Sequence, residues 1–200
     1  MILVVCAVAE ELRGFAHAGV TIVETGVGPV EAAIATTRAL AAHPYAAVVN
    51  AGIGGGFRGR AAVGDVVIVD AEYYLELGRE DGEPLALPGG HTLMLSHSSD
   101  PRLLACAAGV AGARIGCGIT SATITTSDAR AHALDARFAP SVESMEGFAV
   151  LRAAARAGVP AIEVRGISNL VGDRATSGWD FRSASAAAVR GLDALLAAIA

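Results

Sequence analysis

The sequence contains no lysine, and all 15 of its basic residues are arginine. A lysine Schiff base and the lysine-containing phosphate loop of many nucleotide-binding proteins are both excluded. Acidic residues outnumber basic ones, 20 to 15, and the net charge is −5 at pH 7. A domain that binds nucleic acid usually carries a basic face, so we expect no nucleic-acid partner.

The chain has only three cysteines, Cys6, Cys106 and Cys117, and they are dispersed along the sequence with no C-x-x-C spacing. An odd, dispersed set favours a reducing compartment over a disulfide framework. The apolar start Met1–Ala9 lacks the basic residues of a signal peptide. No apolar run approaches the roughly 18–20 residues that a membrane span needs. These patterns predict a soluble, cytoplasmic protein without membrane contact.

Aromatic residues make up only 4% of the chain, although 53% of its residues are hydrophobic and 24 are glycine. Such a chain packs through small side chains and close backbone approach, as layered α/β proteins do. Its 200 residues suit one domain with a sizeable core, so we expect residues 1–200 to form a single domain. The apolar excess also leaves room for a buried subunit interface.

Short apolar runs alternate along the chain with segments that have helical signals. The continuous apolar run Met1–Val8 predicts a strand buried on both faces. Further strands are expected over Val20–Glu24, Ala46–Asn50, Asp65–Tyr73, Arg114–Thr125, Ser141–Ser144 and Ala161–Ile167. The helices are expected over Pro29–Leu40, Pro101–Ala111, Ala129–Phe138, Met145–Arg156 and Ser183–Ile199. Loops are expected over Leu77–Asp100 and Ser168–Arg182. The alternation predicts an α/β fold, a single three-layer domain with a central mixed, largely parallel twisted sheet flanked by helices.

Four polar or glycine-rich features follow predicted strands: Glu10-Glu11, Asn50–Phe57, Met145-Glu146 and Ser168-Asn169. In α/β sheets, ligands bind beyond the carboxyl ends of the strands. Each feature alone is weak evidence, because glycines and polar residues are common in turns. Their shared placement at one edge of the sheet predicts a ligand site there.

The glycine-rich stretch Asn50–Phe57 is not a dinucleotide fingerprint, because it lacks the final glycine of G-x-G-x-x-G and follows the third predicted strand. Two interpretations stay open. The glycines could form a tight turn with close backbone packing. They could instead present backbone N–H groups to a flat ligand that side chains would otherwise block.

The carboxylates near the strand ends also allow two interpretations. Glu11 could activate a water as a general base, whereas Glu10 and Glu143 fit solvated surface positions better. Glu146 falls near a predicted helix start, where the helix dipole favours a carboxylate whatever its function. The five histidines lack the spacing of a helical metal pair, and we expect no metal site.

Together these motifs resemble the purine nucleoside phosphorylase and nucleosidase family along nearly the whole chain. The matching segments are Ala7–Leu12, Thr25–Pro29, Asn50–Phe57, Thr126–Asp128, Ser144–Gly147 and Arg165–Asn169. The resemblance implies cleavage of the N-glycosidic bond of a small-molecule purine nucleoside, no metal or organic cofactor, and a homodimer or higher homo-oligomer.

The resemblance also implies a role for individual residues. Glu11 would deprotonate the attacking water, Glu146 would accept hydrogen bonds from the ribose hydroxyls, and Asn169 would hold the base. The other expected substrate contacts are Ile53, Gly54 and Gly55 beside the sugar and base, Met145 against the sugar, Ser168, Arg130 and Ala131 at the purine, and Trp179 over the 5′ substituent.

Asn169 departs from the pattern of the adenine-releasing nucleosidases, which carry an aspartic acid there. An amide NH2 can donate to N7 and to O6 of a 6-oxopurine, but it would face the amino group of adenine. A buried mismatch of that kind costs about 1–3 kcal/mol, so Asn169 predicts a 6-oxopurine. The group that protonates or stabilises N7 stays open between Asp173, a water and hydrogen bonding alone.

The nucleophile is predicted to be water. A phosphorylase needs a cationic phosphate site, whereas this chain places the carboxylate of Glu11 at that position. Arg13, Arg58 and Arg60 could form such a site, although surface ion pairs explain them more simply. A 6-oxopurine phosphorylase, an adenine-type nucleosidase and a non-catalytic nucleoside-binding module are the alternatives.

Overall fold

The computed structural model describes residues 1–79, 81, 83, 85–173, 175 and 177–199. Its strands are β1 (Ile2–Cys6), β2 (Val20–Glu24), β3 (Ala47–Gly56), β4 (Val66–Tyr74), β5 (Ser96–Ser98), β6 (Ala113–Thr120), β7 (Val142–Ser144) and β8 (Ala161–Leu170). Its α-helices are α1 (Pro29–Ala42), α2 (Pro101–Ala107), α3 (Asp128–Phe138), α4 (Gly147–Arg156) and α5 (Phe181–Ile199). Two short 3-10 helices are η1 (Ala9–Leu12) and η2 (Pro88–Gly90).

The strands form one mixed sheet that closes partly on itself. The order β2-β1-β3-β7-β6-β4-β5 runs across it, and β8 pairs with both β3 and β4. Strands β3, β8, β4, β6 and β7 therefore pair in a ring, each with the next. The β3/β7, β4/β5 and β4/β8 pairs are antiparallel and the others are parallel. The predicted mixed, largely parallel sheet is confirmed, whereas the ring was not anticipated.

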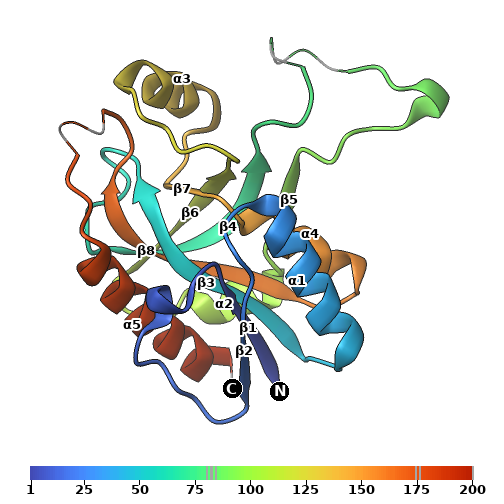
Figure 1. Ribbon diagram of the computed structural model, residues 1–200, viewed down its shortest axis with the longest axis vertical. Coiled ribbons are helices and arrows are strands. Elements are labelled where there is room, and N and C mark those ends of the chain that lie inside the picture. Colours follow the sequence, from blue (N-terminus) through green and yellow to red (C-terminus); the bar gives the residue numbers. More distant parts are fainter. Residues whose placement is uncertain (80, 82, 84, 174, 176, 200) are drawn as a thin grey trace.

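Helices cover both faces of the sheet, as predicted (Figure 1). One core joins alternate residues of β1, β3 and β8 to apolar residues of α2 and α5. A second core joins the opposite faces of β1 and β3 to α1 and α4. Gly166 permits the close approach of α5 to β8, because a Cβ there would overlap the carbonyl oxygen of Ala184 and lie 2.7 Å from the nitrogen of Ala188.

Several predicted boundaries are wrong at the strand ends. The glycine-rich stretch is largely strand, since β3 continues to Gly56 and its glycines pair with β8. Strand β8 likewise continues to Leu170, so the predicted start of a loop at Ser168 is part of the sheet. Strand β6 stops at Thr120, and α2 stops at Ala107. Pairing with a neighbouring strand decides the ends of the strands, and local sequence does not report it.

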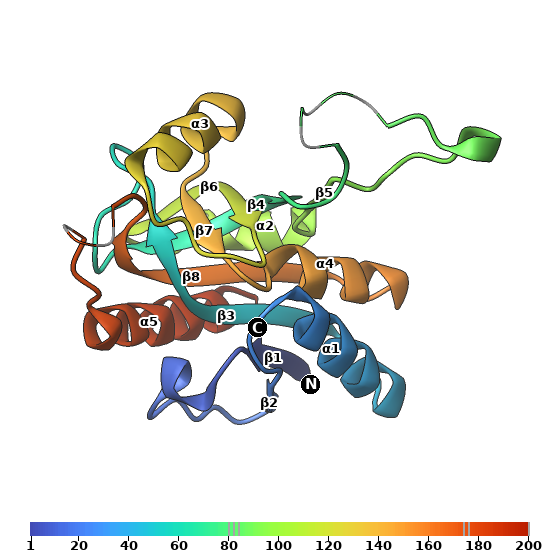
Figure 2. The same ribbon diagram turned by 45° about the horizontal axis from the view of Figure 1, so that its top comes forward.

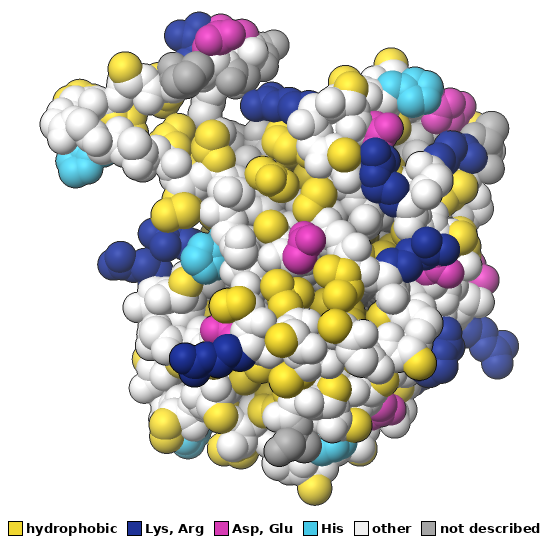
Figure 3. All heavy atoms as spheres, turned by 180° about the vertical axis from the view of Figure 1, so that it is seen from behind, with side chains coloured by type: hydrophobic (Ala, Val, Ile, Leu, Met, Phe, Trp, Pro, Cys, Tyr) yellow, Lys and Arg dark blue, Asp and Glu magenta, His cyan; other side chains and the backbone are white. Residues whose placement is uncertain are grey.

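The predicted excursion over Leu77–Asp100 projects from the end of β4 away from the sheet (Figure 2). Residues 80, 82 and 84 of it lie outside the described residues, as do 174 and 176 of the loop predicted before α5. The excursion returns through η2 to β5, which pairs with β4. Among the described residues, no helix is long and apolar enough to cross a membrane. Figure 3 shows arginines dispersed around the edge of one face, without a continuous basic patch there.

Candidate active site

Glu11 lies on η1, soon after β1, and its carboxylate is held by three backbone N–H groups. Oε2 accepts hydrogen bonds from the nitrogens of Ala7 at 2.9 Å and Val8 at 3.3 Å. Oε1 accepts one from the nitrogen of Ile53, on β3, at 3.0 Å. Glu11 is only 5% exposed, whereas Glu10 is exposed. The fold thus fixes one of the two neighbouring carboxylates and leaves the other in solvent, as predicted for Glu10.

Glu146 precedes α4, but its carboxylate does not cap that helix. Its Oε1 instead accepts a hydrogen bond from the backbone nitrogen of Gly28, at the start of α1, at 2.9 Å. Burial raises the pKa of Glu146 above its ordinary value, and the nearby Arg165 opposes that shift. The interpretation of Glu146 as an ordinary helix-start carboxylate therefore fails, because the side chain is buried and turned to another element.

Arg165, on β8, links the buried carboxylates. Its Nε donates to Oε1 of Glu163 at 2.7 Å, and Nη1 lies 3.7 Å from Oε2 of Glu146. Nη1 also donates to the carbonyl oxygen of Ile53 at 3.3 Å. A Cβ at Gly52 would lie 2.7 Å from Nη1 of Arg165 and 2.9 Å from Oε1 of Glu11. Arg165 and Glu11 thus approach each other beside Gly52, where a larger residue would separate them.

Ser168 and Asn169 lie at an irregularity in the pairing of β3 with β8. Gly54 pairs with Ile167 and Gly55 with Asn169, so Ser168 is an extra residue on β8. A bulge of this kind turns side chains toward a site. The hydroxyl of Ser168 has two acceptors within reach and donates to the nearer one, Oδ1 of Asn169 at 2.8 Å, with the carbonyl oxygen of Gly54 at 3.1 Å. Nδ2 of Asn169 donates to the carbonyl oxygen of Leu170 at 3.1 Å. The two bonds of the amide fix which way it faces.

A cavity of about 330 Å³ opens beside these groups. Nine of the predicted site residues line it: Glu11, Ile53, Gly54, Gly55, Met145, Glu146, Ser168, Asn169 and Trp179. Arg130 and Ala131 do not line it. Arg130 lies on α3 with Nη2 3.9 Å from Oε1 of Glu76, and Ala131 packs in a small core with Phe57. Their contact with a purine stays a prediction.

Some lining residues were missed from the sequence. Glu143, assigned to the surface, is 7% exposed and accepts a hydrogen bond from the backbone nitrogen of Thr125 at 2.7 Å. Its burial follows from the pairing of β7 with both β3 and β6. Phe181 also lines the cavity and meets Trp179 edge to face, with ring centroids 5.7 Å apart. The closely spaced aromatic residues Trp179 and Phe181, just before and at the start of α5, were the available signal in the sequence.

The other polar groups considered from the sequence lie elsewhere. Arg60 forms an ion pair with Asp135, as the surface interpretation predicted. Arg13 lines a separate surface hollow with Phe181 and residues of α5. The carboxylate of Asp173 accepts a hydrogen bond from the nitrogen of Ala175, and Asp173 does not line the cavity. None of these three groups lines the cavity beside Glu11, where Arg165 is the cation that approaches the carboxylate.

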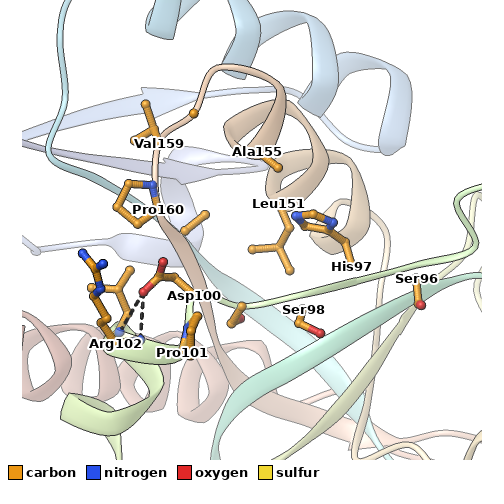
Figure 4. A pocket seen from close by; sticks show the side chains of 14 residues that line it. Ser96, His97, Ser98, Asp100, Pro101, Arg102, Leu151, Ala155, Val159 and Pro160 are labelled. Atoms are coloured by element: carbon orange, nitrogen blue, oxygen red, sulfur yellow. Dashed lines mark hydrogen bonds between the residues drawn. The ribbon is translucent and has the colours of Figure 1, made fainter.

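A larger hollow of about 830 Å³ lies between β5, α2 and the end of α4 (Figure 4). Its one carboxylate is that of Asp100, whose Oδ1 accepts hydrogen bonds from the nitrogens of Arg102 at 2.9 Å and Leu103 at 3.2 Å. That carboxylate is engaged in capping α2. The convergence of acidic and amide groups thus distinguishes the smaller cavity as the candidate active site.

Comparison with known proteins agrees with this geometry. The family model described as the phosphorylase superfamily matches residues 9–200. The chain belongs to the phosphorylase superfamily. A futalosine hydrolase from Streptomyces coelicolor is 41% identical over 84% of this chain and 75% of its own length. A futalosine hydrolase from Thermus thermophilus is 32% identical over 92% of this chain and 84% of its own.

The solved structures support the same fold. The native structure of a Helicobacter pylori futalosine hydrolase superimposes with a TM-score of 0.83 at 17% identity, over 98% of this chain and 97% of the other. At that identity the likeness supports the superfamily fold alone. The sequence relatives, in contrast, are similar enough to place the chain among the N-glycosidic hydrolases of the superfamily.

Glu143 provides a test of the electrostatics of the site. Burial raises its pKa above the ordinary value of 4.5. The folded state then holds the proton more tightly than the unfolded chain, so this contribution to stability is present at low pH and lost as the pH rises through the raised pKa. Glu143→Gln should therefore show a smaller fall in the free energy of unfolding above pH 4.5 than the wild type, measured by urea denaturation.

Glu10→Gln is the matched control, because Glu10 is an exposed glutamate. It should keep the wild-type dependence on pH. A Glu143→Gln variant whose stability follows the wild-type curve at every pH would show that Glu143 titrates as an exposed carboxyl does.

Proposed function

We propose that this chain hydrolyses the N-glycosidic bond of futalosine, releasing hypoxanthine and dehypoxanthine futalosine, a step of menaquinone biosynthesis. The observation that carries the proposal is the convergence of Glu11, Glu146 and Asn169 on one buried cavity. The identity to two futalosine hydrolases supports the choice of substrate.

Glu146 and Met145 supply the ribose site. Cleavage of an N-glycosidic bond passes through an oxocarbenium-like state, in which positive charge develops on the sugar. Buried carboxylates fixed before the reaction stabilise such charge strongly, because no solvent has to reorganise. Oε1 of Glu146 is held by Gly28, and Oε2 is oriented toward Arg165. The carboxylate is thereby held ready to accept hydrogen bonds from the ribose hydroxyls.

Glu11 selects water as the nucleophile. Its three hydrogen bonds from backbone nitrogens fix the carboxylate in place, and a positioned general base contributes about 10²–10⁴-fold in rate. Three carboxylates line the cavity, those of Glu11, Glu143 and Glu146. Arg165, the nearby cation, already contacts Glu163 and Glu146. This acidic surface would repel phosphate and disfavours a phosphorylase.

Asn169 and Ser168 supply the base site. Because Ser168 donates to Oδ1 of Asn169, the amide turns its Nδ2 group away from that hydroxyl. One Nδ2 hydrogen goes to the carbonyl oxygen of Leu170. The other can donate to N7 or O6 of hypoxanthine, whereas adenine would set its own amino group against it. Trp179 and Phe181 form an apolar edge suited to the aromatic 5′ substituent.

We also propose that the chain works in the cytoplasm as a homodimer or higher homo-oligomer. The three cysteines are free, in keeping with a reducing compartment. Exposed apolar side chains continue from the cavity along α1, namely Val27, Val30 and Ile34. Sedimentation velocity should give at least twice the 20.1 kDa mass of one chain, and a monomer at micromolar concentration would contradict the assembly.

The substrate assignment is tested by an assay of purine release from futalosine, inosine and methylthioadenosine, with and without phosphate. We expect hypoxanthine release from futalosine to be fastest and independent of phosphate. Asn169→Asp should shift the ratio of futalosine to methylthioadenosine turnover toward the adenine nucleoside by about 10- to 100-fold, the equivalent of one buried hydrogen-bond mismatch.

Glu11→Gln controls for the chemistry: it should keep the fold and lose at least about 10²-fold in kcat. Release that strictly requires phosphate would overturn hydrolysis. An Asn169→Asp variant with unchanged base preference would overturn the role given to Asn169. Nucleoside binding without turnover in the wild type would instead identify a binding module.

A further inference from the structure

A second pair of acidic side chains lies behind the site, outside the cavity. Glu72, on β4, and Glu163, on β8, are both fully buried. Neither carboxyl lines the cavity, so neither can touch a substrate there. The two strands are neighbours in the ring and pair antiparallel, with Val69 opposite Glu163. A bound substrate therefore does not explain why two acids are buried at this point.

The two carboxyls face each other beneath the first residue of α4. A Cβ at Gly147 would overlap Oε2 of Glu163 and would lie 2.7 Å from Oε1 of Glu72. These two oxygens, Oε1 of Glu72 and Oε2 of Glu163, find no donor among the described residues. A buried acceptor without a donor is costly, and here two such acceptors point at the same place.

The remaining two oxygens of the pair have different partners. Oε2 of Glu72 accepts a hydrogen bond from the hydroxyl of Thr120 at 2.6 Å. That hydroxyl in turn accepts one from the backbone nitrogen of Phe148 at 2.7 Å. Oε1 of Glu163 accepts from the charged Nε of Arg165 at 2.7 Å. Only Glu163 has a cation at hydrogen-bonding distance, so the negative charge belongs on Glu163.

We propose that Glu72 is a carboxylic acid that donates its proton to Glu163, and that this acid–carboxylate pair positions Arg165 for the active site. One proton between Oε1 of Glu72 and Oε2 of Glu163 satisfies both oxygens at once. Glu163 then holds the guanidinium from behind by Nε, while Nη1 faces Glu146 and Ile53 in front. Glu72 and Glu163 are positioning residues, since they act on the sugar and water sites only through Arg165.

The electrostatics of the charged groups around Arg165 agree with this arrangement. Burial, and then the charge of Glu163, raise the pKa of Glu72 well above its ordinary value. If both acids were ionised, Arg165 would face four buried carboxylates, those of Glu11, Glu72, Glu146 and Glu163. Protonation of Glu72 removes one of these charges while leaving the ion pair of Arg165 intact. Like charges this close in a buried site are otherwise strongly unfavourable.

The proton is detectable without any substrate. In the infrared spectrum of the whole protein at neutral pH, Glu72 should give the C=O band of a protonated, hydrogen-bonded carboxyl. Glu72→Gln should remove that band, whereas Glu10→Gln, which changes an exposed glutamate, should leave it. If the spectrum of Glu72→Gln keeps every protonated-carboxyl band of the wild type, the proposal is overturned.

The kinetic consequences rest on the proposed hydrolysis of futalosine. The amide in Glu72→Gln still donates to Glu163, so kcat at neutral pH should stay within about threefold of the wild type. The same variant should also lose the alkaline decline in kcat caused by ionisation of Glu72. Glu72→Leu removes the donor and should lower kcat by about 10²-fold with little change in KM, because Arg165 is misplaced.

These outcomes separate the two proposals. If futalosine is not the substrate, the infrared band still decides whether Glu72 carries the proton. If the band behaves as expected but Glu72→Leu turns over futalosine as fast as the wild type, the pair does not position Arg165. Equal loss of kcat in Glu72→Gln and Glu72→Leu, with both variants folded, would also contradict the positioning role, since an ionised Glu72 would then be needed.

Discussion

The buried guanidinium of Arg165 is the interaction on which the rest of the site depends. It is 1% exposed and reaches the carbonyl of Ile53 and the carboxylates of Glu146 and Glu163. These groups come from β3, β8 and the start of α4, so one side chain contacts all three elements and fixes them relative to one another. A buried charge is tolerated only when it is paired and hydrogen bonded. The acidic groups around it supply that pairing.

The surplus of acid over base at this point is also what the chemistry requires. Glu11, Glu146 and Glu163 carry more negative charge than one arginine can balance, and burial opposes the excess. A sugar that develops positive charge during bond cleavage relieves this imbalance. The folded enzyme thus bears an electrostatic cost that falls as the transition state forms. In the proposed reaction, the same excess of negative charge would also repel phosphate from the anomeric carbon.

The fold class and the edge of the sheet that holds the cavity could be predicted from the sequence for a physical reason, whereas individual contacts such as Trp179 came from the family resemblance. Buried strands are short apolar runs, and ligands gather at their carboxyl ends, so Glu11, Glu146 and Asn169 could be grouped by their places after such runs. The ring of strands could not be predicted, because it depends on which distant strands pair. The same limit explains why Glu143 was assigned to the surface. It also explains why the acidic pair behind Arg165 was missed, although a Glu and an Arg inside the apolar run Ala161–Ile167 were a visible signal.

The most direct test of this account is a comparison of Arg165→Lys with the wild type in futalosine hydrolysis and thermal unfolding. Lysine keeps the charge but lacks the planar fork that contacts several partners at once. The account predicts a folded variant whose kcat/KM is lower by about 10²-fold. The reason is that the lysine side chain no longer fixes the positions of the carboxylates of Glu146 and Glu11. A folded Arg165→Lys variant with wild-type kcat/KM would contradict it.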